Sequence, residues 1–322
     1  MNKQYKYSLA KKGKWICPQC GHKTFVCYVD ENGNVLDESV GKCDRADKCN
    51  HHYPPREYFQ DNNLPEPRPS SVVRPFVPAY VPPSYIEPEI LKRSVENKGN
   101  HLNCFLRYLE DFAGFEAEKI QRMKSEYYIG TAKHWRGATV FWQVDRFGKV
   151  HAGKIMLYDI IQGKRVKEPF NHVTWAHTVM GLTNFNLKQC LFGEHLLDKY
   201  PDKPVAVVES EKTAAILGVV MPSCVAVACG GCGNLTPTMC EPLKGRDVIL
   251  FPDNGKYKEW TEKGKSMAHM FKRLWISAFA EHLAPLQGEG SDIADYILKW
   301  YDSWTREYDG EVPINLSLKQ LK

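Results

Sequence analysis

Two apolar stretches that each end on a carboxylate most constrain the fold of this chain. Val205–Val208 is a short run of small and β-branched residues that predicts a buried strand, and Glu209 follows it at once. Residues 247–251 repeat this design, and Asp253 follows them after Pro252. A helical pattern follows each acid. Strand–helix units of this kind predict a parallel sheet, which binds ligands at the carboxyl ends of its strands.

Two carboxylates at the ends of strands in one parallel sheet repel each other unless a cation lies between them. Mg²⁺ suits such a position, because it is commonly held by one or two carboxylates together with substrate phosphates. A third acidic position, with Asp292 and Asp295, begins a later helical pattern and could complete the site. The alternative is that Glu209 and Asp253 only cap the helices that follow them.

The first 60 residues contain two pairs of cysteines. Cys17-Pro-Gln-Cys20-Gly is the tight knuckle that directs two thiolates at one metal, and Cys43 and Cys49 form the second pair. The residues between the pairs predict a small β-hairpin. Four thiolates around a hairpin predict a structural zinc ribbon over residues 1–60.

The spacer of five residues in the second pair is wider than usual, so Cys27, His51 or His52 could replace one ligand. A redox-active Cys-x-x-Cys is the other alternative, but the βαβ context that it needs is missing. Lysines and aromatic residues accompany the ribbon. They would allow it to hold single-stranded nucleic acid.

Prolines are frequent in residues 61–86, and their frequency predicts a semi-rigid linker. Residues 87–200 then show short helical patterns and a hairpin made of residues 138–145 and 149–158. Basic residues on and after this hairpin, together with one from the 205–218 region, predict a surface for a nucleic-acid backbone. They are Lys154, Lys164, Arg165, Lys167 and Lys212.

The end of the chain predicts one long helix and a tail. Apolar residues recur at intervals of three or four from Trp260 to Phe279, which predicts a helix packed on the sheet. Residues 301–322 are expected to form a C-terminal tail beyond it.

Composition limits the class of protein. A chain of 322 residues predicts two or three domains, and a net charge of +5 permits nucleic-acid binding without requiring it. Its 11 cysteines lack the spacing of secreted proteins, and no apolar segment follows Met1. We therefore expect a reduced, cytoplasmic setting.

These motifs together resemble a known family. Strand–Glu209, strand–Asp253 and the Gly-x-Asp of residues 290–292 are similar to the Toprim domain of bacterial-type DNA primases and type IA topoisomerases. Primases also place a zinc module ahead of this domain. The resemblance implies an α/β chain (α+β overall), in which residues 87–200 are the N-terminal subdomain of a primase-like core. Residues 201–300 would be the Toprim domain, a parallel sheet flanked by helices.

The resemblance implies a nucleotidyltransferase that joins nucleoside triphosphates into primers on single-stranded DNA. Its catalytic residues would be Glu209, Asp253, Asp292 and Asp295, and the first three would hold Mg²⁺ or Mn²⁺. A length of 322 residues leaves no room for the helicase-interacting domain of chromosomal primases. It implies a compact primase of the kind found on mobile elements or phages, for which a helicase partner stays open.

One departure from the family concerns the second acidic site. Primases usually carry Asp-x-Asp there, whereas this chain reads Asp253-Asn254-Gly255. The third site, Asp-Pro-Asp-Glu in many primases, reads Asp292-Ile-Ala-Asp295 here. Two carboxylates fewer predict weaker binding of divalent cations, for which Glu211, Asp292 and Asp295 could compensate. The first alternative is therefore a zinc-ribbon/Toprim module that binds single-stranded DNA without synthesis. A Toprim nuclease is the second; a topoisomerase would need a gate domain for which the length leaves no place.

Overall fold

The computed structural model describes residues 7–45, 48–64, 81–97, 101–282, 290–307 and 318–321. The chain forms two compact units, residues 1–80 and 81–322, called here the N-terminal unit and the C-terminal unit. Most of the predicted proline-rich linker, residues 65–80, lies outside the described residues. Among the described helices, none has the length and apolar character needed to cross a membrane.

The N-terminal unit is a small antiparallel sheet whose strands follow chain order. They are β1 (Ser8–Leu9), β2 (Phe25–Val29), β3 (Gly41–Cys43) and β4 (His52–Tyr53), followed by helix α1 (Pro55–Asp61). The buried centre consists of Phe25 and three cysteines, Cys17, Cys27 and Cys43. So few buried residues supply little hydrophobic stabilisation, and a unit of this size usually needs a metal or a cross-link to fold.

The C-terminal unit begins with helices and an antiparallel sheet. The helices are α2 (Pro88–Val95), α3 (Cys104–Asp111) and α4 (Ala117–Glu126). The strands are β5 (Gly130–Ala132), β6 (Ala138–Val144), β7 (Val150–Met156) and β8 (Val173–Trp175), in that order across the sheet. The pairing of β6 with β7 confirms the predicted hairpin.

Strand β6 is buried on both faces because its side chains alternate between two cores. Val140, Trp142 and Val144 belong to one cluster, with Ile86 and Val150. Phe141 belongs to the other cluster, which continues into the second sheet of the unit. The period of two along a strand places these residues on opposite faces.

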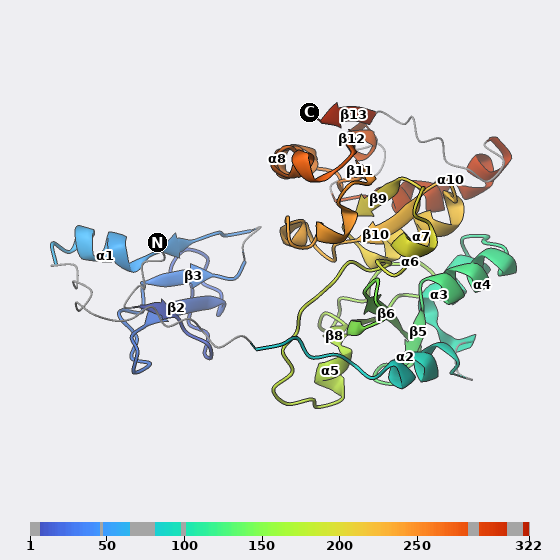
Figure 1. The fold of residues 1–322 in the computed structure, drawn as a ribbon. Coiled ribbons are helices and arrows are strands. Elements are labelled where there is room, and N and C mark those ends of the chain that lie inside the picture. Colours follow the sequence, from blue (N-terminus) through green and yellow to red (C-terminus); the bar gives the residue numbers. More distant parts are fainter. Residues whose placement is uncertain are drawn as a thin grey trace. The chain divides into compact units, whose positions relative to one another are not determined.

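The second sheet has the order β10-β9-β11-β12-β13 (Figure 1). Its strands are β9 (Val205–Val208), β10 (Val225–Ala228), β11 (Asp247–Leu250), β12 (Arg273–Ser277) and β13 (Leu318–Leu321). The first four are parallel, and β13 runs antiparallel to β12. The two strands predicted to precede Glu209 and Asp253 are β9 and β11, which are neighbours at the centre of this sheet.

Helices cover both faces of the second sheet. They are α7 (Glu211–Val220), α8 (Tyr257–Met267) and α10 (Ile293–Glu307), while the short α5 (Ala176–Val179) and α6 (Leu196–Lys199) precede the sheet. The connection from β9 to β10 and that from β11 to β12 run in opposite directions across the sheet. Right-handed crossovers therefore place α7 and α8 on opposite faces. The order of the strands reverses between β9 and β11, which is where open α/β sheets bind ligands.

Two expectations change in the structure. The helix expected from Trp260 to Phe279 ends at Met267, and Leu274 and Trp275 lie on β12. The expected tail 301–322 contains the end of α10 and strand β13, which extends the sheet. Residues 87–200 and 201–300 share one hydrophobic cluster, to which Phe141 and Val207 both belong.

Candidate functional site

The four predicted cysteine ligands meet in the N-terminal unit. The sulfur atoms of Cys17, Cys20, Cys43 and Cys49 all lie within 4.8 Å of one another. The Sγ atoms of Cys17 and Cys49 are 3.8 Å apart, and those of Cys20 and Cys43 are 3.9 Å apart. Thiolates bound to zinc at about 2.3 Å lie about 3.8 Å apart at the corners of a tetrahedron, so the cluster fits this metal.

The residues that could have replaced a zinc ligand make other contacts. The Cys27 thiol contacts the carbonyl oxygen of Glu38, and burial raises its pKa to about 11. The His51 ring stacks on Phe25, and His52 Nε2 lies 3.0 Å from the Tyr28 hydroxyl oxygen. The structure therefore favours the set of four cysteines.

The second candidate site lies at the carboxyl ends of β9 and β11. Glu209 directly follows β9, and Asp253 follows β11 by three residues. Leu250 of β11 pairs with Val207 of β9, so the two strands end at the same edge. We call the five acids that meet here the acidic edge: Glu209, Glu211, Asp253, Asp292 and Asp295.

The environment of Glu209 and Asp253 opposes their ionisation. Burial raises the pKa of Glu209, and its Oε2 atom is buried without a hydrogen-bond partner among the described residues. Burial, followed by the charges of Asp292 and Glu209, raises the pKa of Asp253 to about 8. Both carboxylates would be stabilised in the ionised form by a nearby cation. The unpartnered oxygen of Glu209 is the atom best placed to bind one.

Asp292 and Asp295 form a capping box at the start of α10. The backbone N–H of Asp295 donates to Asp292 Oδ1 over 2.9 Å, and that of Asp292 donates to Asp295 Oδ2 over 3.2 Å. The hydroxyl of Thr213, on α7, donates to the second oxygen of Asp292. The backbone N–H of Asn254 donates to the carbonyl of Ser291 over 2.8 Å, which ties the Asp253 loop to this helix start.

Two lysines neutralise two of the five acids. Lys154 Nζ, from β7, lies 3.1 Å from each oxygen of Glu211, whose side chain is 1% exposed. Lys212 Nζ lies 3.1 Å from Asp295 Oδ1. Among the described residues, no ion pair forms with the other three acids, Glu209, Asp253 and Asp292. The acidic edge therefore keeps three carboxylates outside the ion pairs of this part of the chain, although the charge of Lys212 also acts on Asp292 and Asp253.

These pairings change two predictions about nucleic-acid binding. Lys154 and Lys212 are largely buried in ion pairs with carboxylates, so neither is available as part of a basic surface. Lys164, Arg165 and Lys167 remain on the segment between β7 and β8, outside such pairs among the described residues. Glu211, expected to compensate for a missing metal ligand, instead binds Lys154.

The carboxylates of the acidic edge are less closely gathered than the cysteines. In the described part of the chain, no second group of three or more Asp, Glu, His or Cys ligand atoms lies within 4.8 Å. Gly255, where the resemblance calls for a second Asp, has a φ of +83°, and a Cβ atom added there would meet open space. Its N–H donates to Glu281 Oε1 over 2.7 Å, a contact that sequence reasoning did not anticipate.

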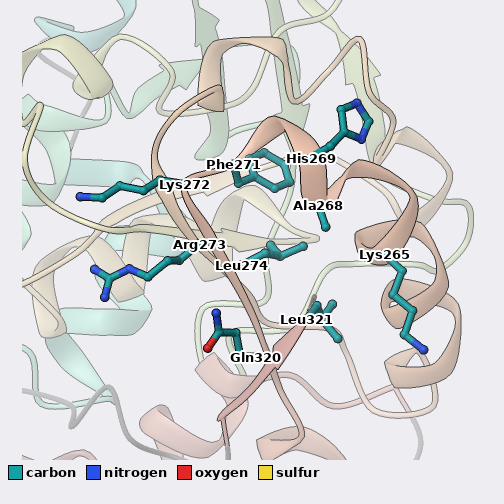
Figure 2. A pocket seen from close by; sticks show the side chains of 9 residues that line it. All are labelled: Lys265, Ala268, His269, Phe271, Lys272, Arg273, Leu274, Gln320 and Leu321. Atoms are coloured by element: carbon teal, nitrogen blue, oxygen red, sulfur yellow. The ribbon is translucent and has the colours of Figure 1, made fainter.

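A cavity of about 490 Å³ lies at the opposite edge of the same sheet (Figure 2). It is lined by Lys265, Ala268, His269, Phe271, Lys272, Arg273, Leu274, Gln320 and Leu321. Figure 2 shows Lys272 and Arg273 extending to one side and Lys265 and His269 to the other, so the basic groups do not converge. Arg273 is also bound to Asp247. The acidic edge therefore remains the candidate functional site of the C-terminal unit.

Comparison with known families and structures gives the following matches. Residues 5–64 match a family described as a zinc beta-ribbon finger, and residues 103–254 match a domain of unknown function, DUF6371. No curated protein matches the chain.

Solved structures that resemble the chain include three primase fragments. A DnaG catalytic core has a TM-score of 0.43 and 13% identity, covering 67% of this chain and 79% of that chain. The DnaG primase catalytic domain bound to single-stranded DNA gives 0.43 and 13%, covering 68% and 76%. The primase fragment of the bacteriophage T7 primase-helicase gives 0.37 and 13%, covering 92% and 98%.

Proposed function

We propose that this protein is a primase-like nucleotidyltransferase that joins nucleoside triphosphates on a single-stranded DNA template. The observation that carries the proposal is the group of three carboxylates, Glu209, Asp253 and Asp292, at the switch point of the second sheet, where no described residue forms an ion pair with them. Such a group fits a site for Mg²⁺ or Mn²⁺. A bound ion would supply charge stabilisation to the transferring phosphoryl group.

The residues of the chain have distinct roles in this proposal. Glu209 and Asp253 bind the ion, and Thr213 holds Asp292 in place through its hydroxyl. The ion pairs of Lys154 with Glu211 and of Lys212 with Asp295 fix the elements around the site and limit its negative charge. Lys164, Arg165 and Lys167 provide the positive charge for the template.

The zinc ribbon has a structural role in this proposal. Its four thiolates complete the tetrahedral coordination of zinc and leave no position open for a substrate. We propose that Zn²⁺ folds the N-terminal unit, which then contributes to binding the template.

A second candidate is a module that binds single-stranded DNA without synthesis. Two observations favour it: the described carboxylates are not gathered within 4.8 Å, and Gly255 supplies no carboxylate. Fewer ligands weaken the binding of divalent cations. For the same reason, a synthetic activity should be greater with Mn²⁺, which binds such sites more tightly than Mg²⁺ does.

The test is template-directed synthesis by the full chain with labelled nucleoside triphosphates and either ion. The wild-type protein should make short primers, and Glu209→Gln should abolish them while binding of single-stranded DNA stays intact. Glu262→Gln, the same change at an exposed position of α8, is the matched control and should retain synthesis.

Three outcomes are informative. DNA binding without primers in either ion would favour the binding module. Release of nucleotides from the template that is lost in Glu209→Gln would favour the nuclease. Synthesis that survives in Glu209→Gln would contradict the site itself.

A further inference from the structure

The loop between β7 and β8 brings together aromatic rings that the acidic edge does not use. Phe170 is 55% exposed, and its ring stacks on that of His172 with centroids 4.3 Å apart and an angle of 19°. The Trp135 ring, from the turn between β5 and β6, lies 5.1 Å from His172 and 6.5 Å from Phe170. We call Trp135, Phe170 and His172 the aromatic cluster.

Positive charge surrounds this cluster. Lys133 and Arg136 lie close to Trp135 in the sequence, on either side of it. The backbone N–H of His172 donates to the carbonyl of Val166 over 3.1 Å. That bond places the cluster beside a second basic stretch. The stretch consists of Lys164, Arg165 and Lys167, with Glu168 as its one acid.

The same loop packs on Tyr108, whose phenol lies within electrostatic range of the acidic edge. Gly163 packs so closely on the Tyr108 ring that a Cβ atom there would lie 2.2 Å from a ring carbon. Burial raises the pKa of the Tyr108 phenol, on which the charges of Lys212 and Asp295 also act. The charges of Lys212 and Arg165 both act on the buried phenol of Tyr158. The loop therefore carries the aromatic cluster and also packs on a tyrosine near the acidic edge.

We infer that the aromatic cluster and its basic surroundings form a stacking platform for the bases of single-stranded DNA. An exposed ring among cations suits a nucleic-acid strand, whose bases stack on aromatic side chains while its phosphates contact Lys and Arg. A protein partner with an apolar surface is less suited, because five cations and one acid flank the rings. The inference rests on the proposed function and gives the template a position on the C-terminal unit.

The experiment compares two oligonucleotides that carry the same phosphates. One is an oligothymidylate of about 12 nucleotides, within the range of single-stranded binding sites. The other has abasic positions throughout. Binding of each to the full chain is measured by fluorescence anisotropy at several salt concentrations.

Phe170→Ala should weaken binding of oligothymidylate roughly 5- to 150-fold, the loss typical of one stacked base, and leave binding of the abasic strand unchanged. Phe170→Trp, which keeps an aromatic ring at this position, should bind oligothymidylate about as well as the wild-type protein does. Phe147→Ala is the matched control, because Phe147 is 80% exposed on the turn between β6 and β7 and lies outside the cluster. Lys167→Gln should weaken binding of both strands and reduce the salt dependence by about one phosphate contact.

The inference is wrong if Phe170→Ala binds oligothymidylate as well as Phe147→Ala does, or if it loses both strands equally. It is also wrong if the wild-type protein binds neither strand. Primer synthesis is measured separately. The wild-type protein could make no primers and still bind single-stranded DNA in a way that depends on Phe170. That result would contradict the primase proposal and support the stacking platform.

Discussion

The cysteine cluster of the N-terminal unit and the acidic edge of the C-terminal unit differ in how far the protein alone gathers its metal ligands. The four sulfurs lie within 4.8 Å of one another, whereas no three carboxylates in the described residues lie so close. The thiols of this cluster differ in pKa: a backbone hydrogen bond from His22 and the adjacent sulfurs lower the pKa of Cys20 to about 6, whereas desolvation and the adjacent sulfurs raise that of Cys49 to about 12. The four sulfurs therefore need not all be charged before a metal binds.

The acidic edge limits the repulsion between its carboxylates in another way. Two of its acids are paired with lysines, one is held by Thr213, and Asp253 has a pKa raised to about 8. Under the proposed function, a cation bound with its substrate would supply the positive charge that these acids lack. A closed site serves structure, and an open site of partly protonated acids suits a metal that arrives with its substrate.

The largest expected effect comes from removing one cysteine ligand of the zinc cluster. Cys17→Ser should release the single zinc and unfold the N-terminal unit, because structural zinc binding contributes on the order of 10–16 kcal/mol to the folding of such small domains. Native mass spectrometry should report the loss of zinc. Hydrogen exchange should show lost protection within residues 7–64 and an unchanged C-terminal unit.

Cys27→Ser is the control for this experiment. Cys27 is buried in the same unit but is bonded to Glu38 and is not part of the cluster, so that variant should keep one zinc. Loss of zinc in Cys27→Ser, or retention in Cys17→Ser, would contradict the assigned ligands.

A smaller effect tests whether lysines act as built-in counterions at the acidic edge. Lys154→Met leaves Glu211 buried without its partner, which should lower the free energy of unfolding by about 3–5 kcal/mol. Adding Glu211→Met should recover most of the loss. Lys199→Met breaks the ion pair with Glu126, in which Lys199 is largely exposed, and should cost less than about 1 kcal/mol. Urea unfolding measures these changes, and a cost equal to that of Lys199→Met would show that the buried pair is not a structural counterion.

Stability should depend on pH through Asp253. Its pKa is raised from 3.8 to about 8 in the folded protein, so the folded state binds the proton more tightly than the unfolded chain does. Stability of the metal-free protein should therefore fall as pH rises from about 4 through 8. Mg²⁺ competes with this proton. Its stabilisation of the protein should grow with pH, from near zero at about pH 6 to about 1–3 kcal/mol at about pH 9.

Thermal unfolding with and without Mg²⁺ checks this dependence, and Asp253→Asn should remove most of it. An Mg²⁺-induced shift of the melting temperature that is equal at both pH values would show that the proton on Asp253 does not compete with the cation.

The smallest effect concerns the missing carboxylate. Gly255→Asp should cost about 1 kcal/mol, because a non-glycine residue is strained at a φ of +83° although space surrounds the side chain. It should also tighten Mg²⁺ binding. Gly245→Asp shares the positive φ and the open space but lies before β11, at the other edge of the sheet. Calorimetric titration should show tighter binding in Gly255→Asp alone; equal affinities would place residue 255 outside the metal site.

Local patterns in the sequence were sufficient for the central strands and for the zinc ligands. The run Val205–Val208 and the strand before Asp253 are strongly apolar and end abruptly, so their bounds and their acids could be predicted. The Cys17 knuckle is equally local. In both cases the chemistry lies within a few consecutive residues.

Contacts between distant segments could not be predicted in this way. Lys154 was expected on an exposed hairpin, but folding of β7 against α7 places it on Glu211. Leu274 and Trp275 continued a helical spacing, yet pairing with β11 and β13 makes them part of β12. The cluster of Trp135 with Phe170 joins two loops and leaves no pattern within either one.

Strand β13 has a consequence for the order in which the protein is made. Leu321 is buried beside Gly264 of α8, and β13 covers the outer edge of β12. A growing chain on the ribosome reaches residue 49 early, so the zinc ribbon can fold during translation. The core of the C-terminal unit cannot close until residue 321 has been made. Until then, and in any chain shortened before residue 318, β12 is an open edge strand on which nascent chains can associate.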